Sequence, residues 1–88
     1  MSVKKWTKLI EKTKKKIDRL GNKLERARQK MEDGKISKAK FSQIKARVAK
    51  QERELWGKVR RYEKLRLRAE RRLKEKKKKK EEKKKKGE

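Results

Sequence analysis

Nine apolar or small residues recur along the first part of the chain at spacings that alternate between three and four. This is the a/d repeat of a helix that packs along its whole length against another helix. Gly21 and Asn22 lie off the repeat, so the sequence predicts one helix over residues 3–33, with a kink at these two residues as the alternative. The repeat consists of Val3, Trp6, Ile10, Thr13, Ile17, Leu20, Leu24, Ala27 and Met31.

A second repeat of the same kind predicts another helix over residues 37–73. The step from Leu55 to Val59 is four instead of three, which changes the supercoil locally. Folding the chain about residues 35 and 36 sets Ile17 near Leu55 and Ile10 near Tyr62. We therefore expect an all-α protein, a long antiparallel two-helix hairpin of the coiled-coil kind. The second repeat comprises Phe41, Ile44, Val48, Gln51, Leu55, Val59, Tyr62, Leu65 or Arg66, Ala69 and Leu73.

The segment between the repeats contains the residues that end one helix and start another. Gly34 can adopt the left-handed conformation that follows a helix end, and Ser37 is a favoured N-cap. Ile36 and Phe41 have the spacing of a hydrophobic staple around that cap. The sequence therefore predicts a turn at residues 34–36.

The stretch 74–88 contains ten lysines, four glutamates and one glycine. Its helix propensity is high, but no apolar stripe offsets the loss of conformational entropy on ordering. We expect the hairpin to occupy residues 1–73, followed by a basic C-terminal extension. This extension is predicted to be either a frayed continuation of the second helix or a disordered tail.

The composition argues against an enzyme. The 88 residues are 28% hydrophobic and 57% charged, too few apolar residues for a globular core. Histidine and cysteine are absent, which removes the imidazole base, the thiol nucleophile and the usual zinc ligands. Carboxylates spread singly among lysines, where we expect them to pair at i,i+3 or i,i+4, offer no shielded acid pair. We therefore expect no catalytic site, cofactor, metal or small-molecule substrate.

The charge predicts a nucleic-acid partner. The 37 basic and 13 acidic residues give a net charge of +24, which favours a polyanion. Six of the eleven arginines fall within residues 60–72, and the guanidinium group contacts phosphates in bidentate fashion and stacks on bases. The alternative is a solvated face on which Glu63 and Glu70 pair with these arginines. The candidate nucleic-acid-binding residues are Arg60, Arg61, Arg66, Arg68, Arg71, Arg72, Lys4, Lys5, Lys8, Lys15, Arg19, Arg26 and Trp56.

The basic residues of the first helix cover almost every face outside the repeat, an arrangement that suits burial among several phosphate backbones. Trp56 lies one residue beside the repeat position Leu55. It could widen the core or stack on an unpaired base. The other three aromatic residues fall on the repeats and should pack between the helices. No motif for sequence-specific recognition is present, so base-specific reading is not predicted.

Small size, extreme basicity, long arms and a lysine-rich tail together resemble the small ribosomal proteins of archaea. Abundant Lys and Glu, a single asparagine and no cysteine resemble hyperthermophile compositions. The turn GKIS (residues 34–37) followed by IKARVAK (residues 44–50) is similar to the two-helix large-subunit family uL29, and residues 24–48 resemble a SHOCT-type hairpin. The ribosomal resemblance implies a structural constituent of the large subunit, bound to rRNA and neighbouring ribosomal proteins.

Three functions follow as hypotheses. The first is an rRNA-binding ribosomal protein that neutralises and braces phosphate backbones. The second is a nucleoid or chromatin-type DNA-binding protein, which a one-sided basic face would favour. The third is a coiled-coil adaptor whose apolar stripes pair with another protein. Neither a signal peptide nor a membrane-spanning stretch is apparent, so we expect a cytoplasmic location, on the ribosome.

Overall fold

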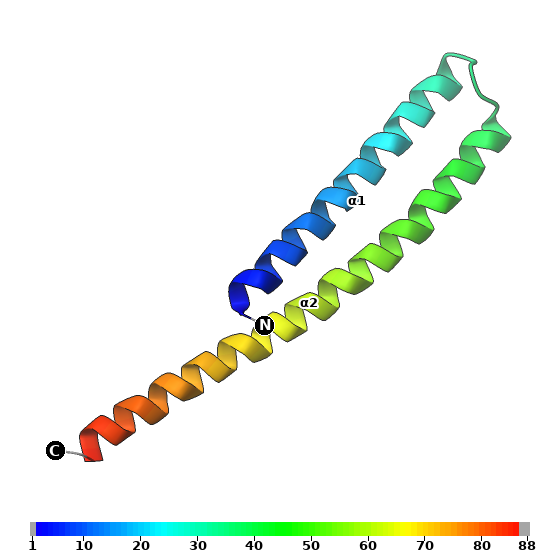
Figure 1. The fold of residues 1–88 in the computed structure, drawn as a ribbon. Helices are drawn as coiled ribbons and strands as arrows, with labels where there is room; N and C mark the ends of the chain where they lie inside the picture. The colour runs from blue at the N-terminus through cyan, green and yellow to red at the C-terminus, as the bar shows by residue number, and fades with distance from the viewer. Residues whose placement is uncertain (1, 87–88) are drawn as a thin grey trace.

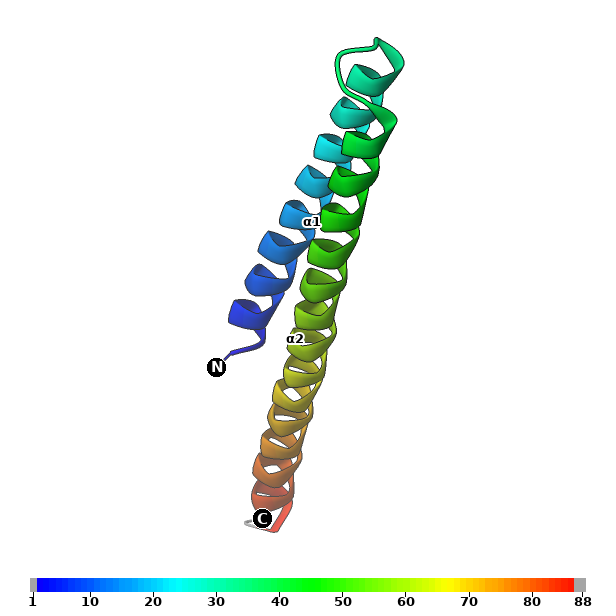
Figure 2. The same cartoon turned by 90° about the vertical axis from the view of Figure 1, so that its right-hand side faces the viewer.

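The computed structural model describes residues 2–86, and it describes side chains over residues 2–77. This part of the chain forms two helices, α1 (Val3–Glu32) and α2 (Lys38–Lys86). They run antiparallel and side by side from the turn to the start of α1, beyond which α2 continues alone (Figure 1, Figure 2). The expected all-α hairpin is confirmed.

The molecule is a rod that measures 78 × 16 × 14 Å. Its length is that of α2, because 49 residues at about 1.5 Å each extend about 73 Å. Two helices side by side give the narrow cross-section. Each helix consequently buries one stripe and leaves most of its surface uncovered.

The turn satisfies the carbonyl groups at the end of α1 with backbone hydrogen bonds. Gly34 has a φ of 76°, in the left-handed region. Its N–H donates to the Met31 carbonyl at 3.1 Å, and the Lys35 N–H donates to the Lys30 carbonyl at 2.8 Å. This pair of bonds is a Schellman motif, in which a glycine avoids the Cβ clash. Because Asp33 is the C-cap, α1 ends one residue earlier than predicted.

Serine side chains cap both helices. The Ser37 Oγ accepts the Lys40 N–H at 3.1 Å, so α2 begins one residue later than predicted, with Ser37 as its cap. The Ser2 Oγ accepts the Lys5 N–H at the start of α1, at 3.4 Å. Ile36 is half-buried beside the second cap, as a hydrophobic staple requires. The capping residues thus set where each helix starts.

The core is a narrow stripe between the helices. Ile10, Ile17 and Val59 form its central cluster, with Leu55 and Tyr62 packed against them. These are residues that folding the chain about the turn places together. Val59 is 1% exposed, so the four-residue step in the second repeat keeps the stripe directed inward. The remaining buried positions are Thr13, Ala27 and Val48.

Two predicted inward residues of α2 are exposed. Gln51 is a polar side chain at the edge of the interface. Leu73 is 54% exposed because it lies beside the first residues of α1, beyond which α2 has no partner helix. By contrast, α1 continues without a break through Gly21 and Asn22. The single helix that the sequence predicts through these two residues is therefore the alternative that the structure favours.

The extension 74–88 continues α2 as a helix through Lys86. Residues 87 and 88 lie outside the described part of the chain. Of the two alternatives for this segment, the structure favours the helical one. Within the described residues, neither helix has the length and apolar character needed to cross a membrane.

Candidate nucleic-acid interface

The charged residues of α1 form separate rows, because residues seven apart lie on the same face of such a helix. Two rows are basic and one is acidic. Basic residues also lie on two further faces, Lys8 with Lys15 and Lys14 with Arg28, so carboxylates predominate on one face of α1 alone. The first basic row comprises Lys5, Lys12, Arg19 and Arg26, the second comprises Lys16, Lys23 and Lys30, and the acidic row comprises Glu11, Asp18, Glu25 and Glu32.

Members of both basic rows border a groove between α1 and α2 on one side of the rod, which is made of two separate hollows. In its middle stretch, Lys16 and Arg19 lie beside Gln51 and Glu54 of α2. Nearer the turn, the lining includes basic residues of α1 and Lys40 of α2, over a floor of apolar side chains. Among the described residues that line it, Glu54 is the one carboxylate. We call this the basic groove, after the six cations that line it: Lys16, Arg19, Lys23, Arg26, Lys30 and Lys40.

The opposite side of the rod carries most of the negative charge. Each residue of the acidic row directly follows an inward residue of α1, and the glutamates of α2 directly follow Gln51, Tyr62 and Ala69. The helices run in opposite directions. The residue that directly follows an inward residue therefore lies on the same side of the rod in α1 and in α2. We call these residues the acidic flank: Glu11, Asp18, Glu25, Glu32, Glu52, Glu63 and Glu70.

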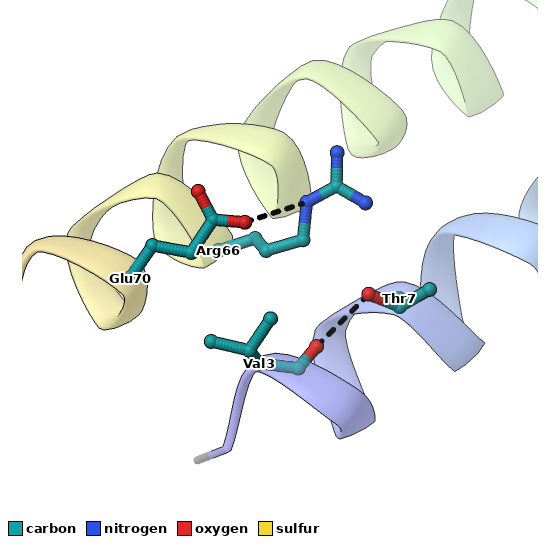
Figure 3. A network of polar contacts seen from close by, with 4 residues as sticks. All are labelled: Val3, Thr7, Arg66 and Glu70. Atoms are coloured by element: carbon teal, nitrogen blue, oxygen red, sulfur yellow. Dashed lines mark hydrogen bonds and ion pairs between the residues drawn. The ribbon is translucent and has the colours of Figure 1, made fainter. Parts of the chain in front are cut away.

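Within the side chains of residues 2–77, two ion pairs form, and both use carboxylates of the acidic flank. Arg28 lies 3.7 Å from Glu25, and Arg66 Nε lies 4.0 Å from Glu70 (Figure 3). Exposed pairs of this kind contribute at most about 1 kcal/mol. Pairing within the helices, expected for most carboxylates, is therefore found at these two positions in the described region.

The six clustered arginines point to different surfaces of α2. Arg68 and Arg72 line a hollow at the start of α1, beside Trp6. Arg60 and Arg61 line a second groove on α2, nearer the turn. Arg66 is half-buried and pairs with Glu70, whereas Arg71 is exposed. The cluster thus divides into two exposed pairs, one exposed residue and one residue that already has a partner.

The predicted lysines and arginines of α1 are all exposed, but they do not share one face. Arg19 and Arg26 lie in the basic groove, and Lys5 continues their row. Lys8 and Lys15 belong to a different row, and Lys4 precedes the acidic row by seven residues. The groove cations Lys16, Lys23, Lys30 and Lys40 were absent from the predicted set. The seven-residue spacing of Lys16, Lys23 and Lys30 is the sequence signal that identifies them. Lys40 is identified by its position directly before the inward residue Phe41.

The tryptophans occupy contrasting environments. Trp6 packs across the helices against Tyr62, with ring centroids 5.8 Å apart and planes tilted by 33°, as expected for residues on the repeats. Trp56 is 45% exposed and lies outside the core. Of the two alternatives for Trp56, the structure does not support the one in which Trp56 widens the core, because Leu55 and Val59 occupy the inward positions on either side of it. Its indole ring is left at the surface.

No group of three or more side chains able to hold a metal ion occurs among the described residues. Comparison of the chain with protein-family models, curated proteins and solved structures finds no match. Function must therefore be inferred from the shape and charge of the rod.

Proposed function

We propose that the chain is an RNA-binding structural protein of the ribosomal kind, whose rod lies between RNA segments and neutralises their phosphates. The observation that carries this proposal is the presence of two separate basic surfaces. The basic groove lies on one side of the hairpin, and Arg60 and Arg61 line a groove elsewhere on α2. Folded RNA presents phosphate backbones in several directions, so it can contact both surfaces at once.

Electrostatics supplies most of the affinity in this proposal. Six groove cations with one carboxylate repel one another in the free protein, and phosphates relieve that repulsion. Each neutralised phosphate also releases condensed counterions. If all six cations contact phosphates, the logarithm of the association constant should fall with the logarithm of salt concentration with a slope of about −4 to −5.

The acidic flank has a distinct role in the same proposal. Carboxylates repel phosphates, so the stretch of this side that carries the acidic row of α1 is expected to face away from RNA. A neighbouring basic protein is the partner that its charge suits. This arrangement would let one narrow rod contact RNA on one side and a ribosomal neighbour on the other.

The direct test measures RNA binding over a salt series. Replacing Arg19, Lys23 and Arg26 with Gln removes three groove charges and should reduce the slope by about two to three. Replacing Lys8, Lys14 and Lys15 with Gln removes the same charge from other faces of α1 and should change the slope by less than one. Equal losses for the two variants would show that the basic groove has no special role.

The second candidate is a nucleoid or chromatin-type DNA-binding protein, and the one-sided basic groove favours it. Sedimentation of the native protein through a sucrose gradient, at low and high salt, separates the two candidates. Migration with one ribosomal subunit that survives the salt wash would support the ribosomal proposal. Migration with DNA that deoxyribonuclease abolishes would support the second candidate.

A further inference from the structure

Trp56 and Gly57 are adjacent residues that the packing of the free hairpin does not require. Trp56 exposes 45% of its surface. Gly57 lies inside α2, where glycine is less favourable than alanine. A Cβ added at Gly57 would meet nothing within 4 Å, so packing within the chain does not require a glycine there. Two neighbouring residues that the fold does not need indicate a contact outside the fold.

The surface beside these residues is basic and partly apolar. Gly57 lines a groove on α2 with Arg60, Arg61, Glu63, Lys64 and Leu67. The groove has three cations and one carboxylate, and Leu67 is 48% exposed. Trp56 lies one helical turn before Arg60. An exposed aromatic ring next to cations is the arrangement that proteins use to hold single-stranded nucleic acid.

We propose that Trp56 and Gly57 form a site for an unpaired nucleobase in a single-stranded RNA segment. The base stacks on the indole ring of Trp56. The bare backbone at Gly57 leaves room for the sugar-phosphate chain to approach α2. Arg60, Arg61 and Lys64 then neutralise the adjacent phosphates. This inference rests on the proposed RNA-binding function and adds the class of RNA that this surface binds.

The charges around the site indicate on which edge of the groove the phosphates lie. Glu63 belongs to the acidic flank, so phosphates are expected on the other edge of the groove, beside Arg61 and Lys64. Stacking needs an exposed base face, and every base has one, so the site should tolerate any sequence. Bases inside a duplex are already stacked on their neighbours and should not occupy it.

Tryptophan fluorescence tests the stacking directly, because the chain has two tryptophans and the other packs against Tyr62. In the Trp6→Phe variant, Trp56 is the sole tryptophan. A short single-stranded oligouridylate should quench its fluorescence, whereas a short RNA duplex and inorganic polyphosphate should bind with little quenching. In Trp56→Phe, none of the three probes should quench the remaining Trp6. Quenching of Trp56 by polyphosphate as strong as that by oligouridylate would overturn the proposal.

Affinity provides a second readout. Trp56→Ala should weaken binding of oligouridylate by about fivefold to a hundredfold and change polyphosphate binding by less than about twofold. Because Trp56 lies outside the core, helicity by circular dichroism should be unchanged. An equal loss for oligouridylate and polyphosphate would contradict stacking.

Gly57 and Gly21 both lie inside helices, so the same substitution at each gives a matched pair of variants. The pair tests whether the site needs the open space at Gly57. Gly57→Gln fills the space beside Trp56 and should weaken oligouridylate binding severalfold, while the helix gains stability. Gly21→Gln makes the same change on α1, where an added Cβ also meets nothing, and should leave binding unchanged. If both variants bind equally well, Gly57 has no role in the site.

The outcomes separate the two proposals. If oligouridylate binds with a steep salt dependence but neither quenches Trp56 nor responds to Trp56→Ala, the nucleobase site is wrong and RNA binding stands. If oligouridylate, duplex RNA and polyphosphate all fail to bind at low salt, the proposed function fails and the nucleobase site fails with it.

Discussion

The ring of Trp6 lies 5.8 Å from the ring of Tyr62, centroid to centroid, and joins the first turns of α1 to α2. The contact lies near the end of the paired region, where α1 begins and α2 continues alone (Figure 1). Farther from this end, the core consists of small aliphatic layers around Ile10, Ile17 and Val59. The aromatic pair thus closes the open end of the hairpin.

Loss of this aromatic pair should destabilise the hairpin. Tyr62→Leu keeps an apolar side chain but removes the ring contact, and we expect the free energy of unfolding to fall by about 1 kcal/mol. Thermal unfolding followed by circular dichroism measures it. Trp56→Leu removes an exposed ring and should alter the free energy of unfolding by less than about 0.5 kcal/mol. A larger effect of Trp56→Leu would place that indole in the core after all.

A charge in the core stripe should open the hairpin. Ile17 is 9% exposed, so Ile17→Asp places a carboxylate without a partner between the helices, which costs several kcal/mol. Helical circular dichroism should drop, because isolated helices of this length are marginal in water. Leu73→Asp at an exposed position is the control and should keep the signal. A full helical signal in Ile17→Asp would contradict the paired structure.

Two glycines should respond to alanine with opposite signs. Gly34 has a φ of 76°, so Gly34→Ala strains the turn and should destabilise the protein by about 1 kcal/mol. Gly21 lies inside α1 with open space around it, so Gly21→Ala should stabilise the protein by up to about 1 kcal/mol. Melting temperatures of the two variants test this. A stabilising Gly34→Ala would exclude the Schellman turn.

The clustered arginines should differ in their contribution to RNA binding. Replacing Arg60, Arg61 and Arg68 with Gln removes three exposed charges and should reduce the salt slope by about two to three. Arg66→Gln should change it by less than one, because Glu70 already partners Arg66. Binding measured over a salt series compares the variants. A slope change for Arg66 equal to that of each other arginine would show that the ion pair opens on RNA.

The hairpin could be predicted because its signals are local. The spacing of Ile10 and Ile17 marks the inward stripe of α1, and Gly34 with Ser37 marks the turn. Exposure of Trp56 could not be predicted in this way. At the four-residue step between Leu55 and Val59 the repeat is displaced, and periodicity alone does not decide how far the neighbouring position turns inward.

The basic groove required knowledge of how the two helices meet. Each basic row is visible in the sequence of α1, but whether Lys40 of α2 joins Lys30 depends on the antiparallel arrangement. The same arrangement gathers carboxylates of both helices on one flank. The net charge predicts a polyanionic partner. The separation of basic and acidic residues onto opposite sides of the rod appears only when the positions of both helices are known.

The unaccompanied part of α2 gives the protein a fixed reach. Between residues 70 and 86 the helix continues past the hairpin for about 25 Å at 1.5 Å per residue. A flexible lysine-rich tail would sample many end positions, whereas a helix holds its far end at a set distance from the paired region. This part of the chain therefore extends the positive charge of the sequence along the rod, beyond the region where the two helices pair.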